Sequence, residues 1–213
     1  MNEIEILKSG LKSMHDLLDK AVDEMTPEQW NYWPHEGGVS AFFSLWHYVR
    51  TEDNMIQSVI RQENTLWLEH GYPLVFNLHK TSQGTGMTHN EAQEVLISDT
   101  NVWSKYQRQV WSSTDELLSE LDIKELHERK IIFNPLPPIS LWNGLFGVCL
   151  THGFRHVGEI EHARGLVGLD GLTILFGVVL SKLSLQCQER LSICVYKQYL
   201  PYRLTEFDYM CKC

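Results

Sequence analysis

Residues 141–166 read LWNGLFGVCLTHGFRHVGEIEHARGL. Apolar side chains recur in this stretch at three- and four-residue steps, which is the pattern of an amphipathic helix with one buried face. Ser140 is suited to cap the start of the helix, and Gly168 and Gly171 follow its expected end near Val167. The face that we expect to be buried consists of Leu141, Leu145, Val148, Cys149, Ala163 and Leu166.

Three further helical patterns precede this one. Apolar residues recur at helical spacing over about 3–23, and a second pattern covers about 40–62. A capping box formed by Thr88 and Glu91 opens a third helix, which we expect to continue to about Leu121. No segment alternates convincingly between apolar and polar residues. The four patterns predict an all-α chain folded as an antiparallel four-helix bundle.

Composition and charge exclude several classes of protein. The chain has 213 residues, of which 43% are hydrophobic and 21% charged, as expected for a globular protein with one main domain. A formal net charge of -9 disfavours a surface that binds nucleic-acid phosphates. No apolar run is long enough to span a membrane, and Glu3 and Glu5 stand where a signal peptide would carry positive charge. We therefore expect a cytoplasmic protein without nucleic-acid or membrane partners.

The C-terminal residues differ from the rest of the chain. Residues 172–213 carry a net charge of +2 and four of the five cysteines, whereas residues 1–171 carry -11 and all ten histidines. We therefore predict a bundle domain over 1–171 and an appended tail over 172–213. The tail is expected to add a fifth helix, cover the bundle or pair subunits, or else to be a non-native end without a selected role.

Two histidines and a carboxylate lie on the apolar face of the last helix. His152 and His156 are one turn apart, and Glu159 falls on the same side. Burying each such group without a partner costs about 1–3 kcal/mol, and a divalent metal ion satisfies imidazoles at this spacing. Ordinary hydrogen-bonded histidines are the alternative. Cys149 is a second candidate ligand, although a small buried apolar role is more typical of it, and His162 points away from this face.

A third ligand should come from another helix, and His47 is the best candidate. It sits among aromatic residues in the second helical pattern. The cleanest apolar stripe of that pattern, however, lies opposite His47, so periodicity alone leaves its role open. The stripe consists of Leu45, Val49, Ile56 and Ile60.

Two segments together resemble the DinB-like family. They are SAFFSLWHYVRTED at residues 40–53 and HGFRHVGEI at residues 152–160. The family belongs to a superfamily that includes YfiT-like proteins and mycothiol-dependent maleylpyruvate isomerases, and the resemblance covers about residues 3–170. It implies a four-helix bundle that holds a divalent metal, commonly nickel or zinc, on His47, His152 and His156. It also implies a homodimer.

The resemblance leaves the reaction open. A common form of the family has Gly-Gln-Ile after the last histidine, where this chain has Gly-Glu-Ile at 158–160, so a carboxylate replaces an amide at Glu159. We expect a metal-dependent thiol transferase or hydrolase that acts on a small molecule, with Glu159 as a catalytic proton shuttle and a low-molecular-weight thiol as a further cofactor. The alternative is a non-catalytic, metal- or ligand-binding stress protein whose histidines are structural.

Overall fold

The computed structural model of the protein describes residues 2–34, 38–133, 137–172, 174–175 and 178–179. The chain divides into two units, Met1–Leu172 and Thr173–Cys213. The described residues of the second unit are those of β3 (Ile174–Leu175) and β4 (Val178–Val179), which pair antiparallel. The predicted fifth helix or non-native end falls almost wholly outside the described residues, so the role of 172–213 stays a prediction. His35, which its place in a loop predicts to be exposed, also lies outside the described residues.

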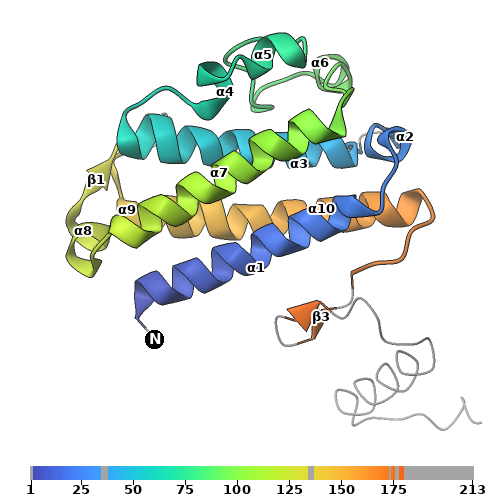
Figure 1. The fold of residues 1–213 in the computed structure, drawn as a ribbon. Coiled ribbons are helices and arrows are strands. Elements are labelled where there is room, and N and C mark those ends of the chain that lie inside the picture. The colour runs from blue at the N-terminus through green and yellow to red at the C-terminus, as the bar shows by residue number, and fades with distance from the viewer. Residues whose placement is uncertain (1, 35–37, 134–136, 173, 176–177, 180–213) are drawn as a thin grey trace, which may run out of the picture. The chain divides into compact units, whose positions relative to one another are not determined.

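The first unit is mostly helical, which confirms the predicted all-α class. In its described part, four long helical segments lie side by side (Figure 1). They are α1 (Glu3–Asp23), α3 (Ala41–Asp53) continued by the π-helix η1 (Asn54–Arg61), α7 (Thr100–Glu120), and α9 (Leu141–Asn143) continued by the π-helix η2 (Gly144–Thr151) and α10 (His152–Leu166).

Short elements connect these segments. Five short helices are α2 (Pro27–Trp30), α4 (Leu66–Glu69), α5 (Tyr72–Val75), α6 (His89–Gln93) and α8 (Ile123–Glu128). Strand β1 (Lys130–Ile131) pairs antiparallel with β2 (Ile139–Ser140) just before α9. The sequence did not predict these strands, because two residues are too few to show an alternating pattern. No helix among the described residues is long and apolar enough to cross a membrane.

Local capping explains where the long helices begin. Asn2 accepts a hydrogen bond from the backbone N–H of Glu5, and the Glu5 carboxylate bonds back to Asn2, which completes a capping box. Ser40 and Ser140 each accept a hydrogen bond from the backbone N–H three residues later. The predicted limits of the first, second and fourth helical patterns therefore agree with the structure to within a residue or two.

The predicted third helix is wrong in one respect, because two helices occupy its range. The capping box of Thr88 and Glu91 forms, but α6 ends at Gln93. The chain then turns so that Val95 and Ile97 are buried, and the Asn31 side chain bonds both backbone groups of Ile97. Asp99 caps a new helix, α7, by accepting from two backbone N–H groups.

The long segments do not all run antiparallel to their neighbours (Figure 1). Ser44 bonds Glu159 near the start of α3, so α3 and α10 run in opposite directions. Two successive contacts from α3 and η1 to α7, Tyr106 to Asp53 and Gln57 to Ser113, show that these elements run in the same direction. The direction of α1 matches that of α10, because Arg164 bonds the carbonyl of Ala21 while Leu150 packs against Gly10.

Candidate metal centre

Three histidines from two helices form one cluster. His47 comes from α3, and His152 and His156 come from α10. Each offers a ring nitrogen, and the three nitrogens lie within 4.8 Å of one another. The ring centroid of His47 is 5.4 Å from that of His152 and 5.0 Å from that of His156. The three histidines that the sequence proposed are therefore brought together and could hold a metal ion.

The second helix places His47 in this cluster because it is buried on nearly all sides. The apolar stripe that includes Leu45 and Val49 packs into the core, as the periodicity predicted. Trp46 and Tyr48, which flank this stripe, are also fully buried, so the burial of α3 extends around the helix toward the side of His47. His47 is half-buried on that side, and its ring faces His156 of α10.

Hydrogen bonds fix which nitrogen two of the histidines present. Nδ1 of His47 bonds the backbone carbonyl of Gln83. A carbonyl can only accept, so this nitrogen carries the proton and Nε2 of the neutral ring carries the lone pair. Nδ1 of His156 lies 2.7 Å from a carboxylate oxygen of Glu159, with the same consequence. Such partners on the outer nitrogen are typical of metal-binding histidines.

His152 is not satisfied in the same way. Its Nε2 lies 2.9 Å from Nε2 of His156, so two ring nitrogens face each other. Its Nδ1 is buried without a regular hydrogen bond, although the Val148 carbonyl one turn earlier acts on its pKa. Burial is the main cause that lowers the pKa of His152 to about 4, and the neighbouring His156 and His47 contribute. Nδ1 of His152 lacks a partner, and the Nε2 atoms of His152 and His156 face each other. A bound cation would explain this arrangement better than a closed network of hydrogen bonds.

Burial likewise lowers the pKa of His47, against the opposing effect of the Gln83 carbonyl. Both rings are therefore neutral near pH 7, which is the protonation state that binds a metal. His156 is itself buried, with 6% of its surface exposed. The cluster thus presents three nitrogen donors, two of them on neutral rings, and leaves room for further ligands.

Glu159 acts on the cluster through His156. Its carboxylate oxygen Oε2 accepts from His156 and, at 2.9 Å, from the buried Ser44 hydroxyl of α3. The hydrogen bond from His156 is the main cause that lowers the pKa of Glu159. Glu159 bonds the nitrogen of His156 that is turned away from the other histidines. Its direct contact is therefore with a candidate ligand rather than with the space between the ligands.

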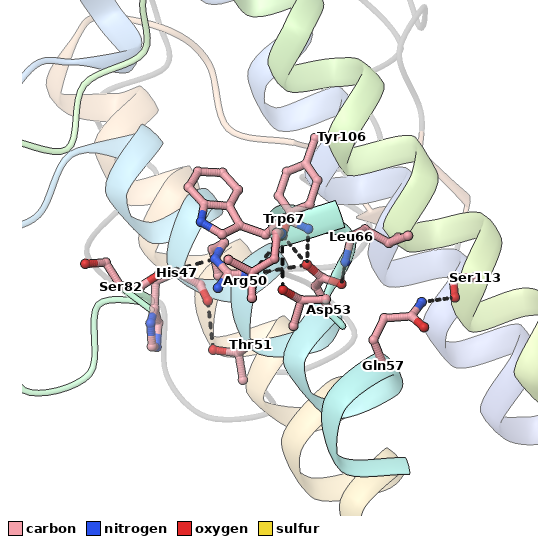
Figure 2. A network of polar contacts seen from close by, with 12 residues as sticks. His47, Arg50, Thr51, Asp53, Gln57, Leu66, Trp67, Ser82, Tyr106 and Ser113 are labelled. Carbon is pink, nitrogen blue, oxygen red and sulfur yellow. Dashed lines mark hydrogen bonds and ion pairs between the residues drawn. The ribbon is translucent and has the colours of Figure 1, made fainter. Parts of the chain in front are cut away.

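A buried polar network holds the connection that carries Gln83 (Figure 2). Asp53 of α3 accepts from the backbone N–H groups of Leu66 and Trp67, from the Tyr106 hydroxyl and from Arg50. Arg50 in turn donates to the carbonyl of Ser82 at 3.2 Å. Ser82 and Gln83 are consecutive, so Arg50 and His47 bond adjacent carbonyls of one segment.

Gly84 allows this segment to approach His47. Its φ of +95° is one that residues with side chains rarely adopt, and a Cβ built on it would lie 2.7 Å from His47 Nδ1. Sequence reasoning did not identify Gly84, Gln83, Ser44 or the Arg50–Asp53 pair as part of the site. Gly84 and Gly86 marked the region only as an irregular connection.

A second buried polar cluster, centred on Glu52, lies in the core next to the three histidines. Glu52 is fully buried and accepts from His15, Tyr48 and Thr114, which come from three different long helices. The Tyr48 ring centroid lies 6.0 Å from those of both His152 and His156. Tyr48 therefore separates the two clusters.

Two other residues considered from the sequence lie outside the ligand cluster. Cys149 is fully buried, and burial raises the pKa of its thiol well above the usual range. This position agrees with a small buried apolar role rather than a thiolate ligand. His162 is exposed on α10, as its place in the sequence indicated.

A cleft of about 810 Å³ opens beside the cluster, and His47 and His152 lie in its wall. The rest of its lining comes from α3 and η1, from the connection around Gln83, from β1 with its flanking residues, from η2 and from Arg155 of α10. Its volume is in the range of small-molecule sites. A small molecule in this cleft would reach the histidine cluster directly.

Comparisons with known proteins agree with this arrangement. A solved structure, described as that of a conserved protein from Enterococcus faecalis, superposes with a TM-score of 0.68 at 22% sequence identity. The match covers 78% of this chain and 98% of the other, and it shows a shared fold. No curated protein matches the sequence. The model of the DinB superfamily matches residues 11–160, which include all three histidines. The chain therefore belongs to the DinB superfamily.

Proposed function

We propose that this protein is a divalent-metal-dependent enzyme of the DinB type, a thiol transferase or hydrolase that acts on a small molecule. The observation that carries the proposal is the convergence of His47, His152 and His156 beside an open cleft. Nickel or zinc suits a set of three imidazoles. A metal bound there would act as a Lewis acid and lower the pKa of a water molecule or thiol that reaches it.

The chain's own residues orient the donors. The carbonyl of Gln83 and the carboxylate of Glu159 hold the protons of His47 and His156 on Nδ1, so that both Nε2 lone pairs point inward. Ser44 fixes the Glu159 oxygen in turn. The cleft gives the small molecule access and lets its apolar parts leave water.

Glu159 is assigned two roles in this proposal. Its hydrogen bonds support a positioning role toward His156, and its 38% exposed side chain leaves the second carboxylate oxygen accessible for proton transfer. Glu159→Gln keeps an acceptor for His156 but cannot take up a proton. We expect this variant to bind metal nearly as well as the parent and to lose most turnover, whereas equal turnover would restrict Glu159 to positioning.

Elemental analysis of the purified full chain tests the metal. We expect about one nickel or zinc per chain, and a loss of at least tenfold in affinity for His47→Ala and His156→Ala, because each removes one of three donors. His162→Ala is the matched control, since His162 lies on the same helix but is exposed and outside the cluster. Metal-free protein, or equal binding by His156→Ala, would contradict the proposal.

Cobalt substitution separates the enzyme from the alternative of a non-catalytic metal- or ligand-binding stress protein. An open coordination position predicts a change in the visible spectrum of the Co²⁺ form when a low-molecular-weight thiol is added. A spectrum that thiols leave unchanged would favour the structural role. A screen of thiols with small electrophiles on the metal-loaded protein would then identify the reaction.

The finer assignments of fold and assembly belong to the same proposal. We infer a four-helix bundle of the DinB type and a homodimer from the superfamily resemblance, and we also propose a cytoplasmic location. Light scattering coupled to size-exclusion chromatography tests the dimer, with a mass of about twice the 24.8 kDa chain expected. A single-chain mass at micromolar concentration would contradict it.

A further inference from the structure

We propose that the cleft beside the histidines binds a small organic anion, held by Arg155 and Lys130. The proposal deepens the proposed function, on which it rests only in treating the bound molecule as the substrate. It concerns charges in the cleft wall that are separate from the three donor nitrogens.

The charge of the cleft wall is opposite to that of the protein. Three basic side chains line it, those of Arg129, Lys130 and Arg155, and none of the described lining residues is Asp or Glu. The whole chain carries a net charge of -9. A concave, uniformly basic surface on an acidic protein concentrates anions locally and repels cations.

Two of the three cations are available to a ligand. Arg129 donates to the Glu125 carboxylate at 2.8 Å and to the carbonyl of Ile60, so its charge is already paired. Arg155 and Lys130 are exposed, and neither forms an ion pair or side-chain hydrogen bond with any residue that the structure describes. A carboxylate or phosphate group in the cleft can therefore contact either of them without displacing an existing ion pair.

Arg155 also lies close enough to act on the histidines. Burial is the main cause that lowers the pKa values of His47 and His152, and the positive charge of Arg155 adds to both shifts. Arg155 sits on α10 between His152 and His156 in sequence. An anionic group on Arg155 would thus place the rest of a small molecule against the donor cluster.

The lining also contains an apolar surface. Ile131, Ile132 and Phe133 follow Lys130 along the chain, and Val59 and Val148 lie in other parts of the wall. Ile132 is 67% exposed, so covering it would remove apolar surface from water. The cleft therefore fits a molecule with an apolar body and one negative group better than it fits an inorganic ion.

Three probes that share a benzene ring but differ in charge test the proposal: benzoate, benzamide and benzylammonium. Ligand-detected NMR titrations use the full chain in metal-stripped and Zn²⁺-loaded forms. We expect benzoate to bind both forms with a dissociation constant on the order of 1 mM, and the other two at least about fivefold more weakly. Added NaCl should weaken benzoate binding.

Arg155→Gln and Lys130→Gln should each weaken benzoate binding about fivefold in both forms, which corresponds to one exposed ion pair. Arg108→Gln and Lys105→Gln are matched controls, because both residues are exposed on α7 and outside the cleft, and they should leave binding unchanged. Circular dichroism and metal content of the variants should equal those of the parent.

Several results would overturn the proposal. They are equal affinity for benzoate and benzamide, unchanged benzoate binding by Arg155→Gln and Lys130→Gln, and no benzoate binding to the metal-stripped protein. Benzoate binding that requires Zn²⁺ and ignores Arg155 would assign the contact to the ion instead. Because the metal-stripped arm needs no metal, a failure of the proposed metal site would leave this test intact.

Discussion

The polar cluster around Glu52 and the cluster of three histidines lie side by side but differ in how their polar groups are satisfied. In the core cluster, Glu52 accepts from His15, Tyr48 and Thr114 and is fully buried. In the cluster beside the cleft, two ring nitrogens face each other and Nδ1 of His152 has no regular partner. A satisfied buried network stabilises one fold, whereas an unsatisfied one at a cleft is suited to a ligand.

The largest effect is expected in the core cluster. Glu52→Ala leaves His15, Tyr48 and Thr114 without their shared acceptor, and such losses in a buried network cost about 3–5 kcal/mol of unfolding free energy. Urea denaturation measures the loss. Glu120→Ala, an exposed change on α7, is the control and should be nearly neutral. A loss of less than about 1 kcal/mol for Glu52→Ala would remove the distinction between the clusters.

His152→Ala, unlike Glu52→Ala, should hardly change the stability of the metal-free protein. In metal-free protein we expect a change of less than about 1 kcal/mol, because the variant removes a buried nitrogen that lacks a regular hydrogen bond. Zinc at about 1,000 times its dissociation constant should stabilise the parent by about 4 kcal/mol and the variant far less. Thermal unfolding with and without Zn²⁺ measures both quantities. Equal stabilisation of parent and variant would exclude His152 as a ligand.

Gly84→Ala should affect the site beside the cleft alone. The new Cβ would lie 2.7 Å from His47 Nδ1, so either His47 or the Gln83 segment must move. We expect about tenfold weaker metal binding by calorimetric titration. Gly86→Ala has a similar backbone strain, with a φ of +80°, but its Cβ meets no atom within 4 Å. Similar losses in both variants would show that strain rather than contact with His47 is responsible.

The smallest expected effect is a pH dependence of metal-free stability. The folded-state pKa of His152 is lowered from 6.5 to about 4, so the unfolded state binds more protons between these values. Stability therefore falls as the pH decreases from about 6.5 toward about 4. Burial shifts the pKa of His47 in the same direction. Urea denaturation in EDTA at about pH 7 and about pH 5 should show a larger difference for the parent than for His152→Ala.

His162→Ala is the control for this measurement, since His162 is exposed. It should retain the full difference between the two pH values. A parent protein whose stability is the same at both would contradict the neutral, buried state of His152.

Much of the fold was predictable because the signals are local. Helical periodicity and caps at Asn2, Ser40 and Ser140 depend on residues a few positions apart. The break between α6 and α7 depends instead on Asn31, which bonds Ile97 from 66 residues away. Helical periodicity could not predict the relative direction of the helices either, because neighbouring helices can run either way when long connections join them.

The candidate site also combines residues that local spacing identifies with residues that it does not. His152 and His156 were identified from spacing on one helix, whereas periodicity left His47 open until the family resemblance included it. Gln83 and Gly84 gave no signal, since a backbone carbonyl as acceptor can belong to any residue. The net charge of the whole chain is negative, so it gave no indication that the charged residues of the cleft wall are basic.

The shared direction of α3 and α7 has a consequence for variation in chain length. A short turn between two long helices makes the second run back along the first, so parallel neighbours need a connection that returns over the whole helix, about 30 Å for α7. Here that return path carries Gln83 to His47. Surface connections usually tolerate insertions and deletions, but a deletion in this one would either reverse a helix or withdraw the acceptor from a donor histidine. Length in this segment is therefore constrained by topology and chemistry together.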